Sequence, residues 1–266
     1  MHTSFEQLSH FYDSDIGNIA RDVVCDNIKA FWPDLHGLRI MGAGYAMPYF
    51  DEVISDDVER VFCVTSLRGR VSGWPHNGKG IVAQAKDNRL PFEHSSIDRA
   101  LLVHHIENCN DMRKALREIW RVLKPNGRVL LVVPNRMGMW ARADWTPWGH
   151  GRPFSHMQIT NFLKDNLLCV EETRGALFVP PLPDSPVMMK SARLIERFGK
   201  NVLPFVAGVH IIEASKQVYA RVDGNGSGSG VLSKTKGLLG TKPQAVPQNF
   251  TSQMLSQEDF PDQFRP

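Results

Sequence analysis

The sequence lacks most of the features that mark a specialised class of protein. Its four cysteines, Cys25, Cys63, Cys109 and Cys169, are far apart and form no CxxC pair. No uncharged apolar run reaches the roughly 18 residues of a membrane span, and no secretory signal precedes Phe5. We therefore expect a soluble, reduced, cytoplasmic protein.

The sequence also has no large excess of positive or negative charge. The chain has 31 Lys and Arg against 28 Asp and Glu, which gives a formal net charge of +3 and a pI near 8.7. No dense basic run is present, so nucleic acid is not indicated as a partner. No internal repeat is visible, and 266 residues with 42% hydrophobic content can bury one sizeable core.

The apolar pattern alternates between strand-like and helix-like segments. An amphipathic helix is expected over 5–31 and another over 111–123, followed by a buried strand at 128–134. Further strands are expected at 38–41, 61–64, 81–85, 99–103, 167–175 and 209–221, with a capped helix over 155–166. Strands alternating with helices predict an α/β fold with a parallel sheet.

We expect one main domain over residues 1–221 and a flexible tail over 222–266. The tail begins near the sequence DGNGSGSG and has few large apolar residues. An insertion at about 180–205 contains a basic amphipathic helix at about 186–200. Such a helix could lie on an anionic membrane, but a lid or core cover is the commoner use and is our interpretation.

A glycine-containing turn follows the first expected strand, in the sequence LRIMGAGYAMPYF. Gly42 and Gly44 would let the backbone approach a ligand where a Cβ would collide. A tight strand-to-helix turn would use the same glycines. The GxG pattern alone does not decide between these interpretations.

The block from Asp87 to Arg136 is more specific. It contains Leu90-Pro91-Phe92, Asp98 at the start of a strand, His104 and Glu107 just after it, a helix ending in the sequence RVLKPNG, and a further strand. This order resembles the type 11 group of class I S-adenosylmethionine-dependent methyltransferases. The resemblance implies a Rossmann-like, seven-stranded, mostly parallel sheet flanked by helices, with an antiparallel last strand. It implies S-adenosylmethionine as cofactor and a small molecule as methyl acceptor.

The resemblance also assigns candidate site residues. His104 would lie beside the methyl-transfer centre, where it could shape the pocket or accept a proton, but a structural histidine that caps the strand end is the interpretation we favour. Glu107 would support the loop. The cofactor-binding candidates are Gly42, Ala43, Gly44, Ser66, Asp87, Asn88, Leu90 and Val103.

Several family positions differ in this sequence. Ile40 stands where an acidic residue usually precedes the glycines, and Thr65 or Ser66 stands where a carboxylate usually binds the ribose. The third glycine is Ala46. Losing a charge-assisted contact costs roughly 1.5 to 3 kcal/mol, or about tenfold to a hundredfold in affinity. A catalytically inactive assembly or interaction module is therefore the alternative function.

The segment after the fifth expected strand, NRMGMWARADWTPWGHGRPFS, is rich in tryptophan and arginine. In the family this region contacts substrate, and aromatic and guanidinium groups suit a planar or anionic molecule. The tryptophans could equally pack a long connection onto the sheet. The candidates for substrate contact are Trp140, Trp145, Trp148, His150 and Arg152.

No metal site is expected. His94, His104 and His105 could be imagined around an ion, but no carboxylate or cysteine stands at an evident ligand spacing. The leading hypothesis is thus a methyltransferase without metal. The sequence says nothing about the acceptor atom or the oligomeric state.

Overall fold

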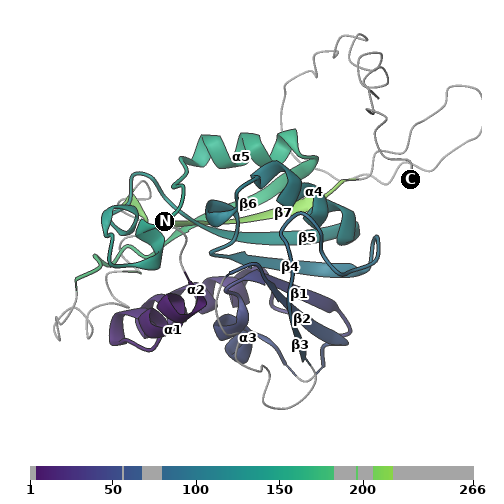
Figure 1. Cartoon of the computed structure of the whole chain (residues 1–266), viewed down its shortest axis with the longest axis horizontal. Coiled ribbons are helices and arrows are strands. Elements are labelled where there is room, and N and C mark those ends of the chain that lie inside the picture. Colours follow the sequence, from purple (N-terminus) through teal and green to yellow (C-terminus); the bar gives the residue numbers. More distant parts are fainter. Residues whose placement is uncertain (1–3, 56, 68–79, 183–195, 197–205, 218–266) are drawn as a thin grey trace, which may run out of the picture. The chain divides into compact units, whose positions relative to one another are not determined.

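The structure is a computed structural model, and it describes residues 4–55, 57–67, 80–182, 196 and 206–217 (Figure 1). Contacts group Met1–Ala220 into one compact unit and Arg221–Pro266 into another. The expected tail at 222–266, the helix at about 186–200 and most of the insertion at about 180–205 lie outside the described residues.

A seven-stranded sheet forms the centre of the first unit. Its order is β3-β2-β1-β4-β5-β7-β6, and β7 runs antiparallel to both of its neighbours while the other pairs are parallel. This confirms the Rossmann-like α/β fold and the antiparallel last strand. The strands are β1 (Arg39–Gly44), β2 (Arg60–Thr65), β3 (Gly80–Gln84), β4 (Ile97–Val103), β5 (Leu123–Pro134), β6 (Leu168–Ala176) and β7 (Val209–Lys216).

Helices cover both faces of the sheet (Figure 1). Alternate residues of β1 show why: Ile40 packs with α1, α2 and α3, whereas Met41 and Ala43 pack in the cluster that contains α4 and α5. The helices are α1 (Phe5–Tyr12), α2 (Asp15–Phe31), α3 (Met47–Val53), α4 (Met112–Val122) and α5 (His156–Asp165), with short 3₁₀ turns η1 (Ile106–Asn108), η2 (Trp140–Arg142) and η3 (Pro147–Gly149).

The single helix expected over 5–31 is wrong in one respect, because the chain turns between α1 and α2. Asp13 ends α1, and Ser14 caps α2 by accepting a hydrogen bond from the Gly17 backbone N–H. Ser4 and Gln7 form a capping box at the start of α1. The turn leaves Tyr12 at the end of α1 with its ring in the core.

The strand order reverses around β1. The chain adds β2 and β3 on one side of β1 and then crosses to add β4 on the other. In sheets of this kind, ligands bind beyond the carboxyl ends of the strands at such a switch point. Within the described part of the chain, no helix is both long enough and apolar enough to cross a membrane.

β5 begins at Leu123, five residues before the expected start at Arg128. The Lys-Pro-Asn-Gly segment was expected only to stop the helix, but it belongs to the strand. A register shift between Ile97 and Arg99 of β4 accommodates the extra residues.

Candidate functional site

Gly44 ends β1 beside Val103, the last residue of β4. Its φ is +77°, and a Cβ there would collide with the Val103 carbonyl oxygen and approach the His105 Cβ to 2.9 Å. The Tyr45 backbone N–H donates to that same carbonyl. Gly44 is therefore needed for the close approach of two strand ends.

Gly42 was expected to leave room for the cofactor, but side chains of the protein itself lie against it. A Cβ on Gly42 would lie 2.6 Å from Phe50 Cε2 and 2.7 Å from the Ala46 Cβ. Ala43 is buried on the opposite face of the sheet. In this conformation, the space beside Gly42 and Ala43 is filled by the protein's own side chains.

A cavity of about 360 Å³ opens at the carboxyl ends of β2, β3 and β4. This volume is in the range typical of small-ligand pockets. Its lining comes from three loops and includes Ser66, Leu67, Lys86, Asp87, Asn88, His104, His105, Asn108, Asn110 and Asp111. Three candidates for cofactor binding, Ser66, Asp87 and Asn88, are thus brought together with His104.

The other candidates for cofactor binding do not line this cavity. Leu90 and Val103 are buried in the core, as are Gly42, Ala43 and Gly44 near the β1 end. At the two family positions without an acid, Ile40 is fully buried and Thr65 accepts a hydrogen bond from the Leu67 backbone N–H. Ser66 is exposed and is the polar side chain at the end of β2 that lines the cavity.

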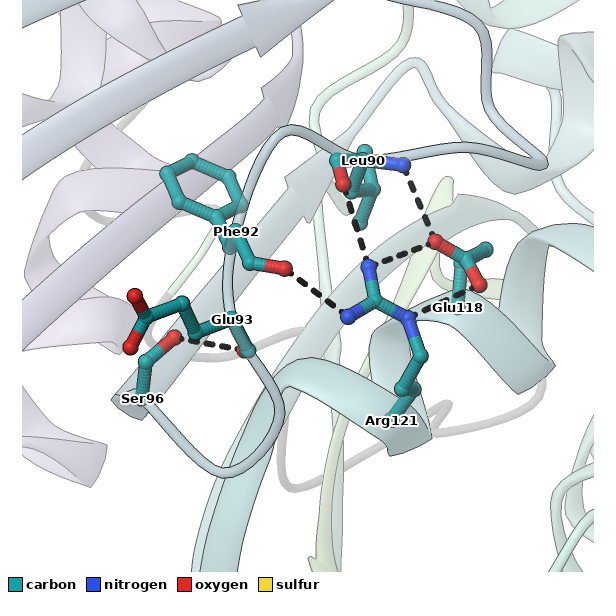
Figure 2. Close-up of polar contacts among 6 residues, drawn as sticks. All are labelled: Leu90, Phe92, Glu93, Ser96, Glu118 and Arg121. Carbon is teal, nitrogen blue, oxygen red and sulfur yellow. Dashed lines mark hydrogen bonds and ion pairs between the residues drawn. The ribbon is translucent and has the colours of Figure 1, made fainter.

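The partly buried ion pair between Arg121 and Glu118 holds the loop at Leu90–Phe92. This loop follows Asp87 and Asn88, which line the cavity. The Arg121 guanidinium donates to the carbonyl oxygens of Leu90 and Phe92 at 3.0 and 2.8 Å, and it pairs with Glu118 (Figure 2). Glu118 also accepts from the Leu90 backbone N–H. The pairing holds the pKa of the Glu118 carboxyl below its usual range. Helix α4 thereby fixes this loop.

Replacing Arg121 by Ala is expected to destabilise the domain by about 2 to 3 kcal/mol, because two carbonyl oxygens lose their side-chain donor and the Glu118 carboxylate keeps only the Leu90 N–H. Urea denaturation followed by circular dichroism measures this change. Arg113→Ala, on the same helix but without a recorded contact to the loop, is the matched control and should change stability by less than about 0.5 kcal/mol. Equal effects of both variants would contradict the assigned role of Arg121.

His104 sits in a closed polar cluster above β4. Its Nε2 lies 2.8 Å from Tyr12 Oη, and Tyr12 Oη lies 2.6 Å from Tyr49 Oη. All three side chains are buried, and burial raises the pKa of both tyrosines. The backbone φ of His104 is +51°, a conformation that costs a residue with a Cβ roughly 1 to 2 kcal/mol.

Glu107 extends the cluster on the other side of the imidazole. His104 Nδ1 lies 3.4 Å from Glu107 Oε1, and both side chains are fully buried. Among the described residues, neither Glu107 oxygen forms a hydrogen bond, and Trp148 Nε1 is likewise buried without an acceptor. The Trp148 ring packs on His104 with centroids 4.0 Å apart. The sequence indicated His104 but gave no sign that Tyr12 and Tyr49 would meet it.

The tryptophan segment divides between core and surface. Trp140 is 1% exposed and donates from Nε1 to the Val179 carbonyl oxygen, so it packs the connection onto the sheet. Trp145 is 47% exposed and, with His150, lines an open cavity of about 1050 Å³ beside α1. Arg152 is exposed, and its backbone N–H donates to the Glu107 carbonyl oxygen.

The prediction that no carboxylate or cysteine stands at ligand spacing from the candidate histidines is wrong, most plainly for His105. Its Nδ1 lies 3.5 Å from Asp87 Oδ1 and 3.9 Å from Cys109 Sγ. Asp87 arrives from the loop after β3, and Cys109 follows His105 by four residues. The spacing of His105 and Cys109 was visible in the sequence, but the approach of Asp87 depends on the fold.

Comparison with known proteins agrees with this geometry. Residues 41–131 match the sequence model of a family described as "Methyltransferase domain". In this segment the sequence is similar to methyltransferase domains, and the sheet has the fold of class I methyltransferases. S-adenosylmethionine is the cofactor of that family.

Curated proteins similar in sequence to this chain include ubiquinone/menaquinone biosynthesis C-methyltransferases named UbiE. The protein from Bartonella tribocorum is 30% identical over 129 residues, which are 48% of this chain and 48% of the relative. The protein from Idiomarina loihiensis is 43% identical over 49 residues, or 18% of this chain and 20% of the relative. The chain therefore spans half or less of the length of these relatives.

Solved structures share the fold at low sequence identity. A chain from the complex between the Haloferax volcanii Trm112 methyltransferase activator and a methyltransferase aligns with a TM-score of 0.57 at 15% identity, covering 82% of this chain and 100% of that chain. An S-adenosylmethionine-dependent methyltransferase from Thermotoga maritima gives 0.52 at 16% identity, covering 79% and 94%. These likenesses establish the fold of the domain.

Proposed function

We propose that this protein is an S-adenosylmethionine-dependent methyltransferase with a small-molecule acceptor. The observation that carries the proposal is the cavity at the strand switch point, where Ser66, Asp87 and Asn88 face the same space as His104. The quinone-pathway names of two relatives give a precedent for a small acceptor.

The cavity residues fit the groups of this cofactor. The Asp87 carboxylate, which is partly exposed, can accept a hydrogen bond from the adenine amino group, and the Ser66 hydroxyl can bond to the ribose. Asn88 adds a backbone N–H and a side-chain amide at the same edge. Bound cofactor supplies an electrophilic methyl group attached to a positively charged sulfur.

His104 is placed to take the proton that the acceptor loses when its new bond to the methyl carbon forms. In this role, His104 Nε2 would receive the acceptor proton. Tyr12 Oη occupies that proton-accepting position now, so the acceptor has to replace it by a shift of α1. Glu107, at 3.4 Å from Nδ1, favours the tautomer with the proton on Nδ1.

The open cavity beside α1 is the proposed approach for the acceptor. It is lined by residues of α1, the start of α2 and the segment at 145–150, including Phe11, Trp145 and His150. Pro147 also lines it, and the adjacent Trp148 packs on His104. The acceptor would therefore reach His104 from the side that Tyr12 covers.

A second candidate function is a non-catalytic interaction module. It is favoured by the buried Ile40 and the engaged Thr65, which supply no carboxylate for the ribose, and by the complete enclosure of His104. This candidate predicts a protein that transfers no methyl group even when cofactor is abundant.

Transfer of a labelled methyl group separates these functions. The full chain is incubated with methyl-labelled cofactor and either the small molecules or the macromolecules of a cell extract. We expect protein-dependent label in the small molecules, reduced about a hundredfold or more in His104→Asn, because a general base contributes about 10² to 10⁴ in rate. Asparagine tolerates the positive φ of this position. Label in the macromolecules would contradict the acceptor class, and label in neither fraction would favour the interaction module.

A further inference from the structure

Asp87, His105 and Cys109 bring three different metal-binding groups to one point. The candidate ligand atoms, one from each residue, all lie within 4.8 Å of one another. His105 and Cys109 are buried, and the Asp87 side chain is 23% exposed at the cavity wall. We propose that these three residues bind a divalent zinc-type ion.

The distances already approach those of a tetrahedral zinc centre. Bonds of about 2.0 to 2.3 Å in tetrahedral geometry separate a nitrogen ligand from an oxygen ligand by about 3.3 Å and from a sulfur ligand by about 3.6 Å. The observed separations from His105 Nδ1 are 3.5 Å to Asp87 Oδ1 and 3.9 Å to Cys109 Sγ. The ligand atoms would have to move closer by only a few tenths of an ångström to reach these bound separations.

The donor set selects the kind of ion. A thiolate and an imidazole are ligands that suit zinc and poorly suit magnesium or calcium, which prefer oxygen. One carboxylate and one thiolate carry two negative charges, which balance a divalent cation. Because Asp87 and His105 line the 360 Å³ cavity, the fourth ligand position faces that cavity.

The two buried ligands differ in how ready they are to bind a metal: His105 needs no loss of a proton, whereas Cys109 does. Burial lowers the pKa of His105, so its imidazole is neutral and has a free lone pair at neutral pH. Burial raises the pKa of Cys109, whose thiol donates to the His105 carbonyl oxygen at 3.1 Å. Metal binding would release that thiol proton. A cysteine that serves only as this hydrogen-bond donor would bind no metal, and this is the alternative that the experiment tests.

This site shares Asp87 with the proposed adenine position. One carboxylate oxygen cannot serve both the ion and the adenine amino group, so metal and cofactor are expected to exclude each other. The metal proposal does not rest on methyl transfer, since ion binding is measured without cofactor. It adds to the proposed function that a thiophilic metal bound at Asp87 would prevent cofactor binding in this cavity.

Cobalt is a suitable spectroscopic probe for this geometry. The purified full chain is treated with a chelator, freed of it and titrated with Co²⁺. We expect uptake of one ion per chain with a thiolate-to-cobalt charge-transfer band and the visible absorption of a four-coordinate ion, both removed by Zn²⁺. Cys109→Ser should lose the charge-transfer band and bind at least about tenfold more weakly.

Cys169→Ser is the matched control, because Cys169 is an exposed free cysteine outside the cluster, and it should behave as wild type. Asp87→Ala, in a partly exposed loop, provides a second variant if Cys109→Ser does not fold, and it should weaken binding while the thiolate band remains. Absence of one-to-one uptake, or a charge-transfer band unchanged by Cys109→Ser, would overturn the proposal. S-adenosylhomocysteine binding to the metal-free protein is measured separately, so failure of the metal site and failure of the proposed function are distinguishable.

Discussion

Replacing Gly44 by Ala is expected to destabilise the domain by about 2 to 5 kcal/mol. A residue with a Cβ at φ +77° costs roughly 1 to 2 kcal/mol, and overpacking adds roughly 1 to 3 kcal/mol. The collision is with the Val103 carbonyl oxygen, which cannot move without disturbing the hydrogen bond from Tyr45. Urea denaturation of the two proteins gives the difference in free energy of unfolding.

Gly37→Ala is the matched control. Gly37 also has a positive φ, +66°, but a Cβ there would meet nothing within 4 Å. This variant should therefore show only the conformational cost of roughly 1 to 2 kcal/mol. If Gly44→Ala were no worse than Gly37→Ala, the close approach of the β1 and β4 ends would not be a constraint on the fold.

Replacing Tyr12 by Phe is expected to destabilise the domain by about 2 to 6 kcal/mol. The change removes one hydroxyl that contacts both Tyr49 Oη and His104 Nε2, and it leaves two buried polar atoms without a partner. Each such atom costs about 1 to 3 kcal/mol. Thermal and urea unfolding of the variant measure the loss.

A double-mutant cycle tests whether the tyrosines act together. Tyr49→Phe alone removes the second hydroxyl of the pair, and the Tyr12→Phe/Tyr49→Phe protein leaves only His104 unpaired. The double variant should thus be destabilised by less than the sum of the single variants. Strict additivity would mean that the two hydroxyls do not share a hydrogen bond in the folded protein.

The fold was largely predictable because its strands are short apolar runs bounded by polar turns. The run at 128–134 is fully apolar apart from its first and last residues, and the structure places it in the middle of the sheet. The turn at Asp13 and Ser14 was missed although Ser14 is a common helix cap, since the apolar spacing of α1 and α2 gave a continuous pattern. The position of Tyr12 depends on this turn.

The site was only partly predictable. His104, Ser66, Asp87 and Asn88 follow strand ends, and the carboxyl ends of parallel strands meet at one edge of a sheet, so their convergence could be inferred. Tyr12 lies 92 residues before His104 and meets it through the packing of α1, which no local pattern specifies. The same is true of Asp87 and Cys109, whose meeting depends on how two loops pack.

Calorimetric titration of the metal-free full chain with S-adenosylhomocysteine tests the central claim that this cavity binds the cofactor. We predict saturable binding with a dissociation constant in the micromolar range, weakened about tenfold in Asp87→Ala by the loss of one hydrogen bond to a charged group. Asp26→Ala, which removes an exposed carboxylate from α2, should leave the affinity unchanged. No binding up to millimolar concentrations, or equal binding by wild type and Asp87→Ala, would contradict the assignment of the cavity as the cofactor site.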